Sequence, residues 1–210
     1  MTGLRERQKA DRLARILRAA AHGFETRGYA RTGIQEIAQG AGLAVGTVYN
    51  YFRSKPEIAL ALVQRDSAAV LAAGEALLEA PPRDPVAAVR ALVDVALEPF
   101  VHRDRALWRE LVAASMRDPG LLEGLFAEDL RLIALLAALL RKLQERGALR
   151  REVEPGRAAL VLYGVFFSWF LAWISRDGLD PASLRREVHG GIELVMRGLC
   201  APLPQRRRTR

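Results

Sequence analysis

GLAVGTVYNYFRSK, residues 42–55, is the stretch of this 210-residue chain that decides the fold. Two glycines, two tyrosines, a threonine and a lysine give it more polar groups than a buried helix carries. Val48 and Phe52 lie four residues apart, so a helix places them on one side. The stretch therefore predicts a short helix at about 45–51, with an apolar side facing inward and polar groups left outside.

A second short helix is expected over residues 34–41, where isoleucines and alanines recur at helical spacing and Gly42 ends the pattern. Two short helices joined by a tight glycine turn form a helix-turn-helix, whose second helix enters the major groove of DNA. Gly46 permits close approach of the backbone, and hydroxyl, amide and ammonium groups can reach base edges or phosphates. The DNA contacts expected on this second helix and just after it are Val45, Gly46, Thr47, Tyr49, Asn50, Tyr51 and Lys55.

Residues 16–60 resemble the DNA-binding domain of the TetR family of transcriptional regulators. The matching elements are Phe24 with Gly28-Tyr29, Thr32, Ile37-Ala38, Ala41-Gly42, Gly46 through Tyr49, and Phe52 with Ser54-Lys55. The resemblance adds Thr32 to the expected DNA contacts. It also implies a homodimer, an effector pocket in a helical C-terminal domain, and ligand-driven release from a palindromic operator.

Two positions depart from the family pattern. Ala44 stands where a serine often caps the recognition helix, and losing that cap costs about 0.5–2 kcal/mol of local stability. Gly33 lacks the hydroxyl that would contact a phosphate at that position. Neither departure removes the pattern of buried residues.

Apolar spacing along the chain predicts an all-α protein of about nine helices, with no sustained alternation that would indicate strands. We expect a DNA-binding domain over residues 1–55, a helical effector-binding and dimerisation domain over 56–200, and a disordered basic tail over 201–210. The expected helices are one ending at Gly28, then 34–41, 45–51, 55–79 linking the domains, 84–98, 104–117, 119–146, 155–176 and 181–199.

Charge is concentrated at the ends of the chain. The net charge is +8; residues 1–56 hold ten Lys/Arg against four Asp/Glu, and the last ten residues add four arginines. This distribution indicates a polyanion partner, either nucleic acid or an anionic membrane. Cys200 is the single cysteine, and the N-terminus is charged rather than apolar, so a reducing cytoplasm is expected.

Residues 158–175 contain no charge and reach the length at which a membrane span must be considered. A small-residue side opposite an aromatic side favours instead a buried helix that packs closely at a dimer interface. An anchor over 157–176 stays open as the alternative, although no membrane partner is expected. The interface residues expected on the last two helices are Val161, Gly164, Ser168, Ala172, Val188, Gly191, Val195 and Gly198.

Aromatic and soft side chains predict where a small hydrophobic or aromatic effector binds. No pair of histidines has metal-ligand spacing, and no catalytic motif is present. We therefore expect no bound metal, no other cofactor and no enzymatic activity. The sequence does not fix where the operator lies relative to the promoter, so activation of transcription stays open as an alternative to repression. The residues expected to line the effector pocket are Phe100, Trp108, Met116, Phe126, Tyr163, Phe167 and Phe170.

Overall fold

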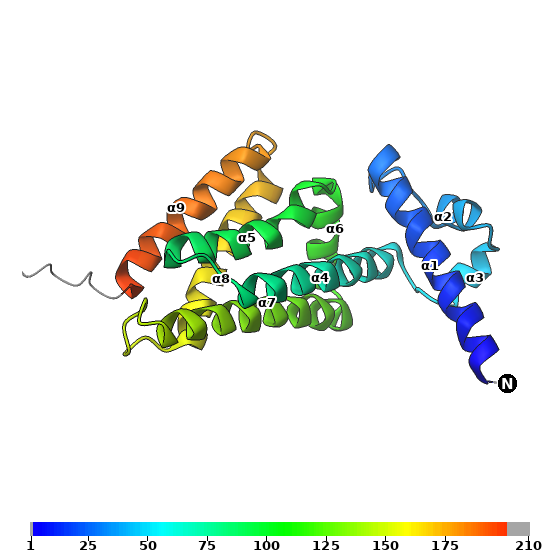
Figure 1. Cartoon of the computed structure of the whole chain (residues 1–210). Helices are drawn as coiled ribbons and strands as arrows, with labels where there is room; N and C mark the ends of the chain where they lie inside the picture. Colours follow the sequence, from blue (N-terminus) through cyan, green and yellow to red (C-terminus); the bar gives the residue numbers. More distant parts are fainter. Residues whose placement is uncertain (1, 201–210) are drawn as a thin grey trace, which may run out of the picture. The chain divides into compact units, whose positions relative to one another are not determined.

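The computed structural model describes residues 2–200, except for the side chain of Thr2, and nine α-helices fill most of that range (Figure 1). The all-α prediction is confirmed; within this range the one isolated β-bridge pairs Leu149 with Cys200. The predicted tail, 201–210, lies outside the described residues. The helices are α1 (Thr2–Arg27), α2 (Ile34–Ala41), α3 (Val45–Tyr49), α4 (Lys55–Glu79), α5 (Pro85–Val101), α6 (Arg105–Ser115), α7 (Pro119–Glu145), α8 (Pro155–Ser175) and α9 (Pro181–Leu199).

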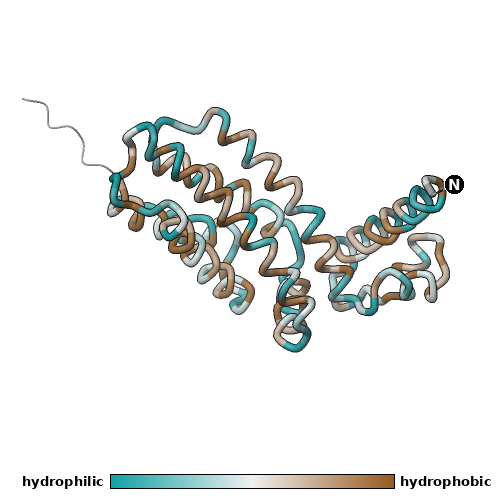
Figure 2. The backbone as a smooth tube through the Cα atoms, turned by 90° about the horizontal axis from the view of Figure 1, so that it is seen from below, coloured by the Kyte–Doolittle hydropathy of each residue, from teal (hydrophilic) through white to brown (hydrophobic). Residues whose placement is uncertain are grey.

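Helix boundaries differ from the predicted ones by a few residues. The third helix ends at Tyr49. Helix α5 continues through Pro99 to Val101, although a proline removes one N–H donor and crowds the carbonyl four residues earlier. Hydrophobic and hydrophilic segments alternate along the helical tubes, as amphipathic helices require (Figure 2).

The chain divides into two compact units. Unit 1 contains residues up to 69 together with 98–129, and unit 2 contains residues 70–97 together with those from 130 onward. Helices α4, α5 and α7 contribute residues to both units. Each unit has a buried apolar core of its own.

The core of unit 1 is built on one face of α1. Ile16, Ala20 and Phe24 are buried on this face, and the ring of Tyr29 packs on that of Phe24 at a centroid distance of 4.9 Å. Thr32 is fully buried beside them, and its hydroxyl donates to the carbonyl oxygens of Gly23 at 2.8 Å and Gly28 at 3.0 Å. These bonds close the segment after α1 back onto the helix.

The core of unit 2 includes the pair α8 and α9, which pack against each other. Leu162 and Trp173 of α8 and Ile192 of α9 are among its buried side chains. Gly191 of α9 faces Val165 of α8 so closely that an added Cβ would lie 2.5 Å from a Val165 methyl carbon. A glycine at position 191 therefore permits the approach of these two helices within one chain.

Gly23→Ala is expected to destabilise unit 1. An added Cβ would lie 2.6 Å from the Thr32 methyl group, which two hydrogen bonds and a β-branched side chain hold in place. We expect urea denaturation to show a loss of about 1–3 kcal/mol in the free energy of unfolding. Gly46→Ala is the control, because its Cβ meets no atom within 4 Å. A Gly23→Ala protein as stable as the wild type would contradict this account of the core.

Candidate nucleic-acid interface

Gly42 makes the turn between α2 and α3. Its φ of 62° and ψ of 41° are left-handed, a conformation that glycine adopts without steric cost. The Gly42 N–H donates to the Gln39 carbonyl at 3.0 Å, and the Leu43 N–H donates to the Ala38 carbonyl at 2.9 Å. Both bonds satisfy carbonyl groups left open at the end of α2. The predicted helix, turn and helix are thus confirmed.

Arg15 fixes this turn against α1. Its Nε donates to the Ala41 carbonyl at 2.9 Å, and a terminal nitrogen donates to the Gly42 carbonyl at 3.0 Å. The guanidinium also lies 3.9 Å from the Asp11 carboxylate, one turn earlier in α1. One side chain therefore sets the position of α1 relative to the start of α3.

Helix α3 and the residues after it have an apolar inner side and a polar outer side. Val48 is fully buried and Phe52 nearly so, as predicted, whereas the Tyr49 side chain is 52% exposed. Asn50 and Gly46 are exposed too. The other predicted contacts on this segment, Val45, Thr47 and Tyr51, are half-buried.

The start of α3 has no side-chain cap. Ala44 occupies the N-cap position and makes no side-chain hydrogen bond there, as the sequence indicated. The outer surface therefore depends on Val48 and Phe52 for its placement. Hydroxyl and amide groups on such a surface can bond to base edges and phosphate oxygens.

The prediction that Thr32 contacts DNA is wrong. Its side chain is fully buried and its hydroxyl is committed to the Gly23 and Gly28 carbonyls. A threonine beside a helix start looks the same in sequence whether it faces solvent or the core. In this structure Thr32 stabilises the link between α1 and α2.

Lys55 makes an internal contact that the sequence did not suggest. Its Nζ donates to the Tyr29 carbonyl at 2.9 Å and lies 4.2 Å from the centroid of the Tyr29 ring. An ammonium over an aromatic face is attracted by the electron density of the ring. Lys55 thus joins the first turn of α4 to Tyr29, two residues after the end of α1. Its contact with a phosphate stays a prediction.

Asp104, the residue that caps α6, also bonds to Tyr29. Its carboxylate accepts from the Tyr29 N–H at 3.0 Å and from the Ala106 N–H at 2.9 Å, the latter as the N-cap of α6. An aspartate before a helix can be recognised in sequence as a cap. Its bond to a residue 75 positions earlier carries no local signal.

Burial is the main cause of the pKa shifts of Tyr29 and Lys55 at this junction. Burial raises the pKa of Tyr29 well above its ordinary value, and the Glu110 carboxylate raises it further. Burial lowers the pKa of Lys55, opposed by Glu110 and Glu36. The Tyr29 phenol therefore stays neutral.

Comparison with known proteins places this unit in a family. Residues 16–62 match the model described as "Bacterial regulatory proteins, tetR family". The chain is 26% identical over 188 residues to the HTH-type transcriptional regulator UidR of Escherichia coli (strain K12), covering 85% of this chain and 91% of that protein. The chain belongs to the TetR family of transcriptional regulators.

Other similar proteins extend the likeness beyond the helix-turn-helix. The HTH-type transcriptional regulator EthR of Mycolicibacterium smegmatis is 30% identical over 138 residues, covering 66% of this chain and 63% of that protein. The crystal structure of Thermus thermophilus FadR, a TetR-family transcriptional repressor in complex with lauroyl-CoA, is 27% identical, with a TM-score of 0.68 over 91% of this chain and 97% of that one. These relatives are transcriptional regulators rather than enzymes.

The TetR-family resemblance led us to expect a dimer interface on α8 and α9, and the structure divides the expected residues. Val161 is 55% exposed, and Gly164, Ser168 and Gly198 are exposed. Ala172 and Val195 are half-buried. Two assignments need correction. Val188 is fully buried in the core of unit 2, and Gly191 faces Val165 of the same chain.

Four large apolar side chains are exposed on these two helices. Leu194 of α9 is 73% exposed, and Leu160, Val161 and Phe167 of α8 are exposed as well. Periodicity distinguishes the two sides of such a helix but does not say which side the rest of the chain covers. Leu160, Phe167 and Leu194 were therefore missing from the predicted interface.

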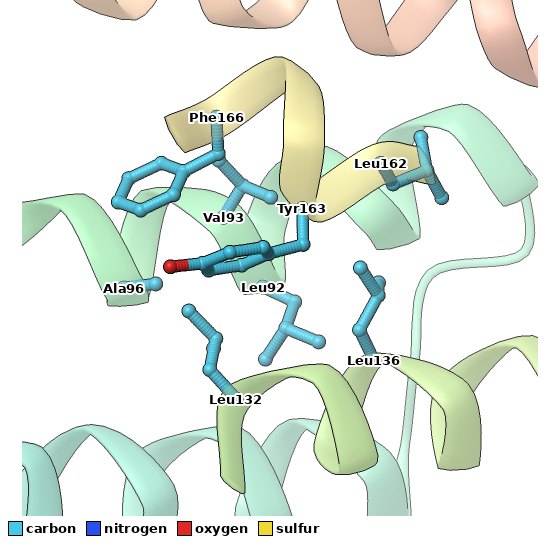
Figure 3. Close-up of a pocket in the computed structure, with 8 residues that line it drawn as sticks. All are labelled: Leu92, Val93, Ala96, Leu132, Leu136, Leu162, Tyr163 and Phe166. Carbon is cyan, nitrogen blue, oxygen red and sulfur yellow. The ribbon is translucent and has the colours of Figure 1, made fainter. Parts of the chain in front are cut away.

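Unit 2 contains an apolar cavity between α5, α7 and α8 (Figure 3). The cavity is small: its enclosed space is about 20 Å³, room for about one water molecule. The Tyr163 ring lies across the cavity with its hydroxyl on the side of Ala96, and it carries the one polar side-chain group among the lining residues (Figure 3). The lining residues are Leu92, Val93, Ala96, Leu132, Leu136, Leu162, Tyr163 and Phe166.

Of the residues predicted to line an effector pocket, Tyr163 alone lines this cavity. Met116 and Phe126 are largely exposed residues of unit 1, where Phe100 stacks on the buried Trp108 at 4.5 Å. Phe167 is exposed and Phe170 is buried elsewhere along α8. Aromatic residues guided the prediction, whereas leucine, valine and alanine supply most of the cavity wall and resemble any other core residues in sequence.

Helix α8 is the one helix in the described range that is long and apolar enough to cross a membrane. Leu162, Phe166 and Trp173 are nevertheless buried within the protein. A core helix satisfies the same criterion, so the composition of α8 does not require a membrane. Across residues 2–200 no group of three His, Cys, Asp or Glu side chains could hold a metal ion.

Asp104→Ala is expected to release Tyr29 from α6. The variant loses both the α6 cap and the bond to the Tyr29 amide, so hydrogen exchange at that amide should accelerate and the free energy of unfolding should fall by about 1–3 kcal/mol. Asp84→Ala is a matched control, since Asp84 also caps a helix, through the Ala87 amide, but does not contact Tyr29. Equal exchange rates at the Tyr29 amide in the wild type and in Asp104→Ala would show that the bond from this amide to Asp104 does not protect it.

Proposed function

We propose that this protein is a ligand-responsive repressor that binds a palindromic operator as a homodimer in the cytoplasm. The observation that carries the proposal is the polar outer side of α3, supported from beneath by Val48 and Phe52. The domain division proposed from the sequence, 1–55 for DNA and 56–200 for effector and dimerisation, is retained in this account.

The predicted reading surface consists of Gly46, Thr47, Tyr49, Asn50 and Tyr51. The space above Gly46 is open, so a DNA backbone or base edge could approach the helix there. The Tyr49 hydroxyl is suited to a phosphate oxygen, and the Asn50 amide is suited to a base edge. A slim helix with these groups fits the width of the major groove.

Dimerisation through α8 and α9 would supply the second reading helix. A symmetric pair reads two half-sites about 34–36 Å apart, one turn of the duplex. The side chains of Leu160, Val161, Phe167 and Leu194 are exposed on these two helices, and a partner that covered them would remove apolar surface from water. The exposed Gly164 and Gly198 would let backbones approach closely.

The cavity in unit 2 is the proposed effector site, and it must widen to admit a ligand, because its enclosed space of about 20 Å³ holds about one water molecule. Its aliphatic wall favours a hydrophobic ligand, and the Tyr163 hydroxyl could bond one polar group of that ligand. FadR of Thermus thermophilus, a similar protein, was crystallised with lauroyl-CoA, which has an acyl chain. Ligand binding would reduce operator affinity by favouring a conformation in which the two reading helices no longer match the half-sites.

The direct experiment is selection of duplexes from a random library by the full-length protein, followed by titration of the enriched sequence. We expect a palindromic consensus bound at least a thousandfold more tightly than random DNA. Enrichment of no sequence would contradict the proposed function. Transcription in vitro from a promoter carrying the selected site then separates repression from activation.

Asn50→Ala should relax sequence selectivity. Loss of an amide bonded to a base edge removes about 1–3 kcal/mol of discrimination at that base pair and leaves binding to random DNA nearly unchanged. Gln64→Ala removes an exposed amide from α4 and serves as the control. Titrations of the consensus duplex and of its single-base variants measure both. Selectivity equal to that of the wild type would remove Asn50 from the reading surface.

Leu194→Asp should convert the dimer to a monomer, because it places a charge on an apolar surface that the partner would bury. Met116→Asp is the matched control; Met116 is 71% exposed but lies on neither α8 nor α9. Sedimentation equilibrium measures the association state of each variant. A dimeric Leu194→Asp protein, or a wild type that is monomeric at micromolar concentration, would overturn the proposed interface.

A further inference from the structure

Helix α1 begins well before the part of it that packs in the core. Residues 3–13 are all exposed, and the family model matches only from residue 16. At 1.5 Å per residue this segment is roughly 16 Å of helix. In Figure 1 it runs beyond α2 and α3 at the N-terminal end of α1. We call residues 3–13 the basic overhang, because they hold Arg5, Arg7, Lys9 and Arg12 against Glu6 and Asp11.

The charges of the overhang are ordered by helical phase. Arg5, Lys9 and Leu13 follow one another at intervals of four residues and continue into Ile16 and Ala20. Ile16 and Ala20 are fully buried, and Leu13 is already 36% exposed. Glu6, five helical turns before the buried Phe24, lies on this face too. The face that packs in the core from Ile16 onward therefore carries two basic groups and one acidic group nearer the N-terminus, where it is uncovered.

Arg15 fixes the direction of that face. Its bonds to the Ala41 and Gly42 carbonyls hold α1 against the turn that leads into α3. Helix α2, the first helix of the helix-turn-helix, packs against α1, so the continuation of the core face of α1 emerges beside that motif. When α3 lies in the major groove, the sugar-phosphate backbone runs along both sides of it.

We propose that Arg5 and Lys9 of the basic overhang bind DNA phosphates outside the helix-turn-helix, adding a sequence-independent contact to each half-site. This inference rests on the proposed function, because it assumes that α3 enters the groove. Each phosphate neutralised releases counterions, so the overhang should appear as part of the salt dependence of binding. It should strengthen binding to specific and random DNA alike.

Arg7 and Arg18 provide a control in the same helix. Arg7 is two residues from both Arg5 and Lys9, and Arg18 is two and a half turns beyond Lys9, so both lie on the opposite side of α1. Both are exposed. The double variants R5A/K9A and R7A/R18A therefore change the net charge equally, on opposite faces of one helix.

The experiment measures affinity for a random-sequence duplex and for the selected duplex, with the full-length protein, between 50 and 200 mM salt. We expect R5A/K9A to lower the salt slope by about 2 and to weaken binding about tenfold at the lowest salt for both duplexes. R7A/R18A should keep the wild-type slope to within about 0.5. Equal slopes in the two double variants would overturn the proposal, as would an R5A/K9A slope equal to that of the wild type. A wild type without sequence-selective binding would instead overturn the proposed function, which keeps the two failures distinct.

Discussion

The peptide groups of Tyr29 are held from two sides, and the arrangement of unit 1 depends on this. Asp104 at the start of α6 accepts from the Tyr29 amide, Lys55 at the start of α4 donates to its carbonyl, and the ring is buried against Phe24. Because three segments distant in sequence meet at one residue, a shift of α4 or α6 would strain these contacts at the end of α1. Arg15 then connects α1 to the turn before α3. Polar bonds to backbone groups thus link the helices that the proposed response to an effector must move.

Much of the fold could be predicted because glycine, proline and apolar spacing are local signals. Gly28, Gly42 and Gly147 have positive φ and follow α1, α2 and α7 closely, and helices α7 to α9 each begin with a proline. The inner residues Val48 and Phe52 followed from their spacing alone. The prediction that the helix at 84–98 ends before Pro99 was wrong. A proline inside a helix costs less free energy than ending the helix when surrounding contacts favour continuation.

The site could be predicted only where a residue's role is local. Gly42 was recognised from the turn itself and Ala44 from its departure from the family pattern. Thr32 was assigned to DNA but is buried, and Lys55 has an internal partner. Tertiary packing also decides which side of α8 and α9 is covered: Val188 is buried in the core, and the half-buried Gly191 faces Val165 of the same chain. The cavity is lined mostly by aliphatic residues that carry no distinctive pattern, which is why Tyr163 alone was anticipated there.

The proposed function requires that α3 enters the major groove. A cleavage reagent attached at position 50, as Asn50→Cys in a Cys200→Ser protein, reports directly where that residue lies on the selected duplex. We predict cuts within both half-sites, centred about one helical turn apart and related by the dyad of the operator. Cuts confined to the flanks of the site, or absent while the protein stays bound, would contradict the assignment of α3 as the reading helix.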